Sequence, residues 1–431
     1  MKIIMNKKIK DFILYSKKFG YSNSIIFSLF KLFPKSFVLL HQKVNAGTNT
    51  VWPEMATVDP VISLNSVMDY KPWTDFGGAT EPKSSSDERR CFIWFVPDWL
   101  NVWGGGHYTL FRFANYFAQQ GTRNIIYIYN NSRHTSPVQL QSELDKAVPD
   151  CRLEVIIDPK LLPKCTGAIA TTWQSAYDVR AFPFADKKFY FMQDYESQFY
   201  AYGTASMQAN ATYTFGFAGI TGGGWLRQCY ESHGGSATNY LFATDKNIFY
   251  PANSEGKVNK KVSRVFFYGR PSTERRCFDL GMASLKRISE AYPDVEIIIA
   301  GLDLKAKPPF PATLLGNLTL KETGDLYRTC DIGIAFSGTN LSYLPVELMS
   351  SGLPVISNNG PQVEWHCTHN ENSYLCDPTP QAVLEAFTTL YNDMELRQKL
   401  AHGGLKTMEF LTWESQMAKI YDYVSNIIDV K

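Results

Sequence analysis

The segment from Ile332 to Ile356 places a buried strand, a short polar loop, a helix and a second strand in direct succession. The apolar run at 331–337 predicts the first strand, and 344–351 predicts the helix. Ser342 is a suitable N-cap for this helix, and Gly352 is a suitable residue to end it. A strand, a helix and a further strand in this order form a βαβ unit, so the segment predicts an α/β protein with parallel sheets.

The start of this helix is a candidate anion site. Its free backbone N–H groups and the positive end of its dipole favour a phosphate group, and a diphosphate in particular. Glu347 lies one turn further along, where a carboxylate can accept hydrogen bonds from sugar hydroxyls. The same pattern fits an ordinary βαβ unit whose glutamate faces solvent, and the segment alone does not separate the two interpretations.

The loop, Glu347, Gly352 and Pro354 together resemble the signature of the family 4 nucleotide-sugar glycosyltransferases, which are retaining enzymes with the GT-B fold. The resemblance covers about residues 90–425. It implies two Rossmann-like, doubly wound parallel-sheet domains that face each other across a cleft. It also implies a C-terminal helix that crosses back to the first domain.

For the donor site, the resemblance implies that Glu347 binds the ribose of a nucleotide sugar. It further implies that the chain at Ser342, Tyr343 and Leu344 holds the diphosphate. The sequence departs from the family at Thr339, because most members have a second glutamate at this position.

The length of the chain is enough for two domains. We expect a basic amphipathic segment at 1–45 and an acceptor-binding Rossmann-like domain at 46–252, which also takes up the helix at 411–431. We expect the donor-binding Rossmann-like domain at 262–410. The polar run at 253–261 predicts the linker between them.

The second domain opens with a strand that ends at Gly269 and Arg270. The segment GRPSTERRCFDLG resembles the G-R-x-x-x-x-K-G motif of the family, which implies that Gly269, Arg270, Arg275 and Arg276 bind the donor phosphates. Guanidinium suits this role because it forks onto phosphate oxygens and stays charged. The alternative is a solvated helix start. Two cations there oppose the helix dipole, however, so an anion should offset them.

The first domain opens with a strand at 91–97 and a glycine-rich turn that starts a helix. The spacing of these glycines does not fit a dinucleotide fingerprint. It resembles the G-G-x-E loop of the family, which implies that Gly105, Gly106 and His107 lie on the acceptor side, without the acidic residue of that loop.

A second acceptor-side candidate follows the strand that begins at residue 187, where Gln193, Asp194, Tyr195 and Glu196 stand in succession. Two carboxylates at a strand end can position a hydroxyl group or take its proton. We therefore expect Asp194 and Glu196 to be catalytic. The alternative is that both cap the following helix, predicted at 196–209. Family members often have His-Asp here, and Gln193 replaces the histidine.

Four segments, QDYE, TTWQSAYDV, YGRPSTERR and NLSYLPVE, resemble most the rhamnosyltransferases of bacterial surface-glycan synthesis, of the S-layer glycan and rhamnan type. This resemblance implies that L-rhamnose is transferred from dTDP-L-rhamnose, a dTDP-sugar, to a growing surface polysaccharide or lipid-linked glycan. It places Trp173 on the acceptor side. No D-x-D motif stands at a strand end, so we expect transfer without a metal or cofactor, with arginines neutralising the leaving diphosphate.

The charge of the chain is unevenly distributed. Residues 1–43 hold nine lysines and one acidic residue, a net charge of +8, whereas the whole chain has +2, so the remainder sums to −6. Lysines interleaved with apolar residues predict a helix on an anionic membrane surface. A disordered arm, or a helix docked on the catalytic domain, fits the same pattern. The acidic remainder argues against a nucleic-acid partner.

The eight cysteines are scattered, and their spacing fits neither a zinc site nor a disulfide framework. No apolar stretch reaches transmembrane length. We expect a cytoplasmic protein that is peripheral on the inner face of the plasma membrane.

Two other classes share the scaffold. One is a sugar-nucleotide epimerase or a phosphorylase, and seven histidines in all disfavour the epimerase. The other is a non-catalytic sugar-nucleotide-binding subunit, which the departures at Thr339 and Gln193 would fit.

Overall fold

A computed structural model describes residues 88–99, 101–130, 133–134, 136–252, 258, 261–301 and 307–430. The predicted basic segment at 1–45 and its membrane surface lie outside these residues. Within the described part, no helix is both long enough and apolar enough to cross a membrane.

The first sheet is parallel and has seven strands in the order β3-β2-β1-β4-β5-β6-β7. The strands are β1 (Cys91–Val96), β2 (Arg123–Ile128), β3 (Leu153–Ile156), β4 (Cys165–Ala170), β5 (Ala185–Met192), β6 (Ala218–Gly222) and β7 (Ser236–Tyr240). The helices between them are α5 (Gly105–Gln119), α6 (Pro137–Ala147), α7 (Trp173–Ala181), α8 (Thr204–Ala211) and α9 (Gly224–Glu231).

The central strand β1 is buried along its whole length, as expected of a parallel sheet covered by helices on both faces. Its side chains alternate between the two faces. Trp94 packs edge-to-face on Phe117 of α5, with ring centroids 5.6 Å apart. The next residue, Phe95, points to the other face and packs at 5.6 Å on Phe182, which ends α7.

The second sheet is also parallel, with six strands in the order β10-β9-β8-β11-β12-β13. The strands are β8 (Arg264–Tyr268), β9 (Glu296–Ala300), β10 (Thr313–Gly316), β11 (Ile332–Ile334), β12 (Val355–Asn358) and β13 (Tyr374–Cys376). The helices are α10 (Phe278–Ala291), α11 (Leu320–Tyr327), α12 (Tyr343–Ser350), α13 (Pro361–Glu364), α14 (Pro380–Asn392) and α15 (Met394–Met408).

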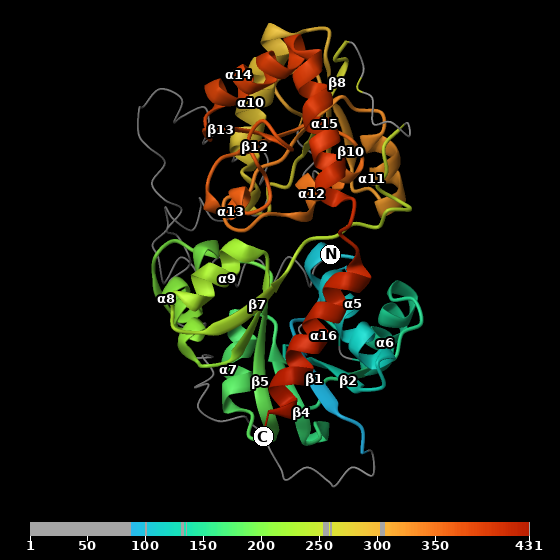
Figure 1. Ribbon diagram of the computed structural model, residues 1–431, viewed down its shortest axis with the longest axis vertical. Coiled ribbons are helices and arrows are strands. Elements are labelled where there is room, and N and C mark those ends of the chain that lie inside the picture. Colours follow the sequence, from blue (N-terminus) through green and yellow to red (C-terminus); the bar gives the residue numbers. More distant parts are fainter. Residues whose placement is uncertain are drawn as a thin grey trace, which may run out of the picture. The chain divides into compact units, whose positions relative to one another are not determined.

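The last helix, α16 (Trp413–Asp429), follows α15 of the second sheet but lies beside α5 and β7 of the first (Figure 1). Gln416 accepts a hydrogen bond at Oε1 from the backbone N–H of Leu241, at 2.8 Å. Trp413 packs edge-to-face on Phe113 of α5. The predicted return of the C-terminal helix is confirmed, as are the two Rossmann-like parallel sheets.

The prediction of one continuous helix at 196–209 is wrong. The chain forms a short 3-10 helix, η2 (Glu196–Phe199), and then α8, with a break between them. Gly203 is extended at the break, and the Ser206 hydroxyl donates to the carbonyl oxygen of Ser197 at 2.8 Å. This bond folds α8 back on η2, which a single continuous helix would prevent.

Candidate functional site

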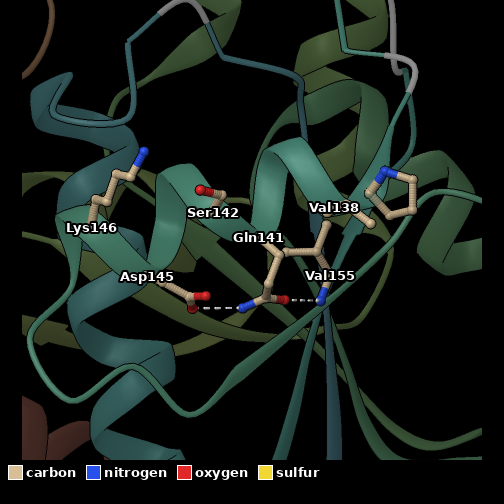
Figure 2. A pocket seen from close by; sticks show the side chains of 7 residues that line it. Val138, Gln141, Ser142, Asp145, Lys146 and Val155 are labelled. Atoms are coloured by element: carbon tan, nitrogen blue, oxygen red, sulfur yellow. Dashed lines mark hydrogen bonds between the residues drawn. The ribbon is translucent and has the colours of Figure 1, made fainter.

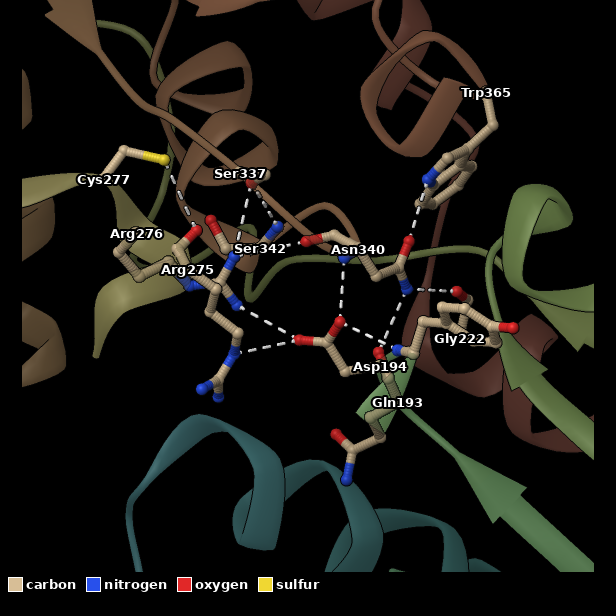
Figure 3. Close-up of polar contacts among 11 residues, drawn as sticks. Gln193, Asp194, Gly222, Arg275, Arg276, Cys277, Ser337, Asn340, Ser342 and Trp365 are labelled. Atoms are coloured by element: carbon tan, nitrogen blue, oxygen red, sulfur yellow. Dashed lines mark hydrogen bonds and ion pairs between the residues drawn. The ribbon is translucent and has the colours of Figure 1, made fainter. Parts of the chain in front are cut away.

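Parallel strands bring their carboxyl ends to one edge of a sheet, and such edges carry the binding residues of α/β proteins. Here β5 leads into Gln193 and Asp194, β8 leads towards Arg275 and Arg276, and β11 leads into the loop before α12. Hydrogen bonds and ion pairs join these three segments, so residues far apart in the sequence form one cluster (Figure 3).

Asp194 lies at the centre of this cluster and is buried. Its Oδ1 accepts hydrogen bonds from the backbone N–H of Asn340 at 2.8 Å and of Tyr195 at 2.9 Å. Its Oδ2 accepts one from Nε of Arg275 at 3.1 Å and lies 3.8 Å from a guanidinium nitrogen of Arg276. Two of the residues predicted for the donor side therefore bind a residue predicted for the acceptor side.

Arg275 and Arg276 belong to the 3-10 helix η4 (Glu274–Arg276). Arg276 donates from Nη1 to Oγ of Ser337 at 3.3 Å and to the carbonyl oxygen of Asn340 at 3.2 Å. Burial lowers the pKa of Arg276 to about 10, while Asp194 acts in the opposite direction, so this guanidinium is charged at neutral pH.

The guanidinium of Arg275 is less enclosed than that of Arg276. It lies 4.1 Å over the ring of Phe199, and about a third of its side chain (32%) is exposed. Arg270 is exposed. Gly269 is buried, and a Cβ there would approach Cγ2 of Ile299 to 2.8 Å, so glycine is needed for the close packing at the end of β8.

Asn340 was not among the predicted site residues, yet it joins the two halves of the cluster. Its Nδ2 donates to the carbonyl oxygens of Gly222 at 2.7 Å and Gln193 at 3.0 Å. Its Oδ1 accepts from Nε1 of Trp365 at 3.1 Å. The only sequence signal was its place in the polar loop before the helix, which asparagine also occupies as an ordinary turn residue.

The helix predicted at 344–351 is α12, and it ends as predicted. Gly352 has a φ of 75°, and the N–H groups of Gly352 and Leu353 donate to the carbonyl oxygens of Met349 and Leu348. Ser342 occupies the N-cap position, but its side chain makes no capping bond. Instead, its backbone N–H donates to Oγ of Ser337 at 3.3 Å.

Tyr343 and Leu344 form the first turn of α12. The Tyr343 ring stacks on Phe242 at 4.5 Å, and its hydroxyl accepts from Oγ1 of Thr109 on α5 at 3.0 Å. A Cβ on Gly105 would lie 4.0 Å from the Tyr343 ring. The glycine turn of the first sheet and the start of α12 are therefore neighbours.

Glu347 follows on the next turn of α12. The hydroxyl of Tyr327 donates to its Oε2 at 3.3 Å. Burial raises the pKa of Glu347 to about 7, and the bond from Tyr327 acts in the opposite direction. Among the described residues, no hydrogen bond reaches its second carboxylate oxygen, which can accept from a further donor.

Glu196 has different partners from Asp194. It accepts a hydrogen bond at Oε2 from the backbone N–H of Trp173, the first residue of α7. Burial raises the pKa of Glu196 to about 8, and this hydrogen bond acts in the opposite direction. Glu196 thus holds the start of α7, a helix other than the one that follows it in the sequence.

The remaining acceptor-side residues have well-defined packing. Gln193 donates from Nε2 to the carbonyl oxygen of Gly106 at 2.8 Å, which ties the end of β5 to the start of α5. A ring nitrogen of His107 lies 3.1 Å from the carbonyl oxygen of Pro97, and burial lowers the pKa of His107. Tyr195 stacks on Tyr213 at 5.2 Å. The structure brings Gln193 and the backbone of Tyr195 to the cluster, and it gives the side chains of His107 and Tyr195 other partners.

Trp173 donates from Nε1 to the hydroxyl of Tyr200 at 3.1 Å. Thr339, which stands where most members of the family that the sequence resembles have a glutamate, is 3% exposed, and its hydroxyl has no hydrogen-bond partner among the described residues. In the same part of the chain, no group of three or more His, Cys, Asp and Glu side chains is placed to hold a metal ion.

A surface hollow beside α6 and β3 contains none of these residues (Figure 2). There the Gln141 amide donates to the carbonyl oxygen of Leu153 at 2.9 Å and accepts from the N–H of Val155 at 3.0 Å. These bonds satisfy the free backbone groups of the edge strand β3, so Gln141 protects a sheet edge.

Comparisons with known proteins agree with this architecture. A family model described as the C-terminal domain of WsaF matches residues 263–388. The O-antigen biosynthesis protein RfbC of Myxococcus xanthus is 36% identical over 341 residues, which are 76% of this chain and 26% of that protein. The chain therefore spans about a quarter of the length of this curated relative.

Solved structures are similar in fold at low sequence identity. Sucrose-phosphate synthase from Thermosynechococcus elongatus has a TM-score of 0.63 at 12% identity, over 80% of this chain and 100% of that chain. HepE from Anabaena in complex with UDP has a TM-score of 0.61 at 15% identity, over 78% of this chain and 100% of that chain. WaaG, a glycosyltransferase involved in lipopolysaccharide biosynthesis, has a TM-score of 0.51 at 11% identity, over 78% of this chain and 99% of that chain. From its two parallel sheets, its returning terminal helix and these neighbours, we conclude that the chain has the GT-B fold.

Proposed function

We propose that the protein is a glycosyltransferase of surface-polysaccharide or O-antigen synthesis, which moves a sugar from a nucleoside diphosphate to a hydroxyl group of a glycan. One observation carries this proposal. Arg275, Arg276 and the chain before α12 converge at the edge of the second sheet, where they meet Asp194 of the first. The similarity to an O-antigen biosynthesis protein supports the class of product.

The donor fits the second sheet. Arg275 and Arg276 supply two guanidinium groups for phosphate oxygens, and the first turn of α12 supplies backbone N–H groups. Glu347 is one turn away, with a carboxylate oxygen available to a ribose hydroxyl. In this assignment the arginines neutralise charge on the leaving diphosphate without a metal ion. HepE, a structural neighbour, has been solved with UDP-glucose, which is a donor of this class.

The acceptor fits the first sheet, at the ends of β1, β4 and β5. Asp194 is our candidate for the residue that positions the attacking hydroxyl or takes its proton, because it forms ion pairs with both arginines. Glu196 is assigned to positioning through its bond to the start of α7. Gly105, Gly106 and His107 form the start of α5, and Trp173 is the first residue of α7, so all four lie at helix starts that follow these strands.

For the sugar itself we propose L-rhamnose from dTDP-L-rhamnose, transferred with retention of configuration. This finer assignment rests on the four sequence segments that resemble rhamnosyltransferases of surface-glycan synthesis. We further propose that the protein works in the cytoplasm at the inner face of the plasma membrane, to which the lysines of residues 1–43 attach it electrostatically.

The test of the function is a donor panel. The purified protein is incubated with dTDP-L-rhamnose, UDP-glucose or GDP-mannose, and release of the nucleoside diphosphate is followed with and without a glycan acceptor. We expect dTDP release from dTDP-L-rhamnose, reduced by Arg275→Ala and unchanged by Arg287→Ala, an arginine of α10 that bonds to Gln381. Binding of a donor without release would indicate a non-catalytic subunit. A changed sugar on an intact nucleotide would indicate an epimerase.

A further inference from the structure

In the structure, the carboxylate of Asp194 occupies the centre of the cationic group that the proposed function assigns to the diphosphate. Its two oxygens accept three hydrogen bonds of 2.8 to 3.1 Å, from Asn340, Tyr195 and Arg275. Two of these donors belong to the second sheet, and Asp194 itself belongs to the first (Figure 3). A carboxylate with these partners has the contacts that a bound phosphate oxygen would have.

The two anions cannot use these donors at the same time. The Nε–H of Arg275 and the backbone N–H of Asn340 each carry one hydrogen and point at Asp194. A phosphate group beside Arg276 would also face the Asp194 charge, which lies 3.8 Å from that guanidinium. A phosphate and a carboxylate on the same guanidinium are close neighbours, and like charges that are close together repel each other strongly where water is excluded.

We propose that Asp194 is a built-in competitor of the donor phosphate: it fills the anion position at Arg275 and Asn340 in the empty protein, and the diphosphate of the donor displaces it. This inference rests on the proposed function, because it takes the arginines to be the phosphate site. It has two consequences. Asp194 lowers the affinity for the donor, and Asp194 reaches the acceptor only after the donor has bound.

Displacement of Asp194 does not require the two sheets to separate. The Asn340 amide remains bonded to the carbonyl oxygens of Gly222 and Gln193, and Gln193 remains bonded to Gly106. The bond from the N–H of Tyr195 to Asp194 lies within the first sheet's own loop. A rotation of the Asp194 side chain therefore exchanges the carboxylate for a phosphate oxygen while the surrounding contacts persist.

The affinity for inorganic pyrophosphate, measured by titration calorimetry, tests this competition without any assumption about the base or the sugar. The variants are Asp194→Asn, Arg275→Ala, Arg276→Ala and the double variant Asp194→Asn with Arg275→Ala. We expect Asp194→Asn to bind pyrophosphate about tenfold more tightly or better, because a neutral amide leaves the arginines to the ligand. In the double variant the gain in affinity for pyrophosphate should be smaller, because the guanidinium of Arg275, which the loss of the Asp194 charge would free for the ligand, is absent.

A matched control is Glu296→Gln. Glu296 accepts from Nε of Arg264 at 2.8 Å, so it forms an arginine–carboxylate pair on the same sheet, but at the amino ends of β8 and β9. The affinity of the Glu296→Gln variant for pyrophosphate should equal that of the unchanged protein. An equal gain in this variant would mean that removal of any negative charge strengthens binding, and would overturn the competition.

Different results would contradict the competition by Asp194 and the phosphate site at the arginines. If Arg275→Ala weakens binding while Asp194→Asn leaves it unchanged or weakens it, Asp194 is no competitor and the phosphate site stands. If neither Arg275→Ala nor Arg276→Ala weakens binding, the arginines are not the phosphate site, and the proposed donor function fails with the inference. Should Asp194→Asn not fold, as judged by thermal unfolding, Asp194→Ser removes the same charge with a smaller side chain and is judged by the same result.

Discussion

The side-chain amide of Asn340, in the loop before α12, donates to the carbonyl oxygen of Gly222 at the end of β6, 2.7 Å away. The two residues are 118 positions apart and belong to different sheets. Asn340 is fully buried, and both its Nδ2 and its Oδ1 are bonded. It therefore links the edges of the two sheets.

Replacement of Asn340 by Ala should lower the free energy of unfolding by about 2–4 kcal/mol, because buried partners lose their hydrogen bonds. Urea unfolding, followed by tryptophan fluorescence, measures the loss. Asn392→Ala is the matched control, because Asn392 is exposed and, among the described residues, its side chain bonds only to its own helix, at Thr388. A change at Asn340 as small as that of the control would show that the two edges do not depend on this amide.

Arg275→Ala should weaken the binding of a nucleoside diphosphate by about tenfold or more, because a charge-assisted contact to phosphate is lost. Arg270→Ala should act in the same direction to a smaller extent, since Arg270 is exposed and its contacts are screened by water. Titration calorimetry with dTDP and UDP gives both values. Full affinity in both variants would contradict the phosphate assignment.

Glu347→Gln separates the ribose contact from the phosphate contact. The amide keeps the shape of the side chain but accepts hydrogen bonds from hydroxyl groups less strongly than a carboxylate does. We expect weaker binding of dTDP and UDP, with little change for pyrophosphate, which has no ribose. Equal losses for all three ligands would place Glu347 at the phosphates or in the folding of α12.

The sequence predicted the two parallel sheets well, because their strands are continuous apolar runs bounded by glycine and polar turns, as at β1 and β11. It also predicted Gly352, whose positive φ follows from its place after a helix. The pairing of Asp194 with Arg275 could not be predicted. These residues are 81 positions apart, and no local pattern states which strand ends of two sheets meet.

The role of Glu196 could not be predicted from a local sequence pattern either. Its position after a strand and before a helical segment is compatible with a catalytic carboxylate or with a cap of the next helix. The structure instead gives it the N–H of Trp173, which opens a helix earlier in the chain. This contact depends on β4 and β5 lying side by side, which is a property of the folded sheet.

Glu196 should make the stability of the protein depend on pH. Burial raises its pKa from the ordinary 4.5 to about 8, so the folded protein holds this proton more tightly than the unfolded chain does. The contribution to stability is therefore complete below about pH 4.5 and is lost as the pH rises through 8. Glu196→Gln removes this dependence.

The difference in free energy of unfolding between Glu196→Gln and the unchanged protein should accordingly grow from pH 5 to pH 8, in favour of the variant. We expect a change on the order of 3 kcal/mol. Urea unfolding at several pH values measures it, with Glu385→Gln on the exposed face of α14 as control. A constant difference across this range would mean that Glu196 is ionised at pH 5 in the folded protein.

Turnover distinguishes the two carboxylates. Asp194→Asn should lower kcat at saturating donor. The carboxylate that positions the acceptor hydroxyl or takes its proton loses its charge, and this interaction is made at the reacting centre. It should not lower donor affinity, since Arg276 keeps its bonds to Ser337 and Asn340. Glu196→Gln should retain most of the activity, because an amide oxygen still accepts from Trp173.

Steady-state rates of nucleoside diphosphate release, with donor affinities from calorimetry on the same preparations, give both quantities. Full kcat in Asp194→Asn, with Glu196→Gln inactive but folded, would exchange the two roles and make Glu196 the carboxylate that acts on the acceptor.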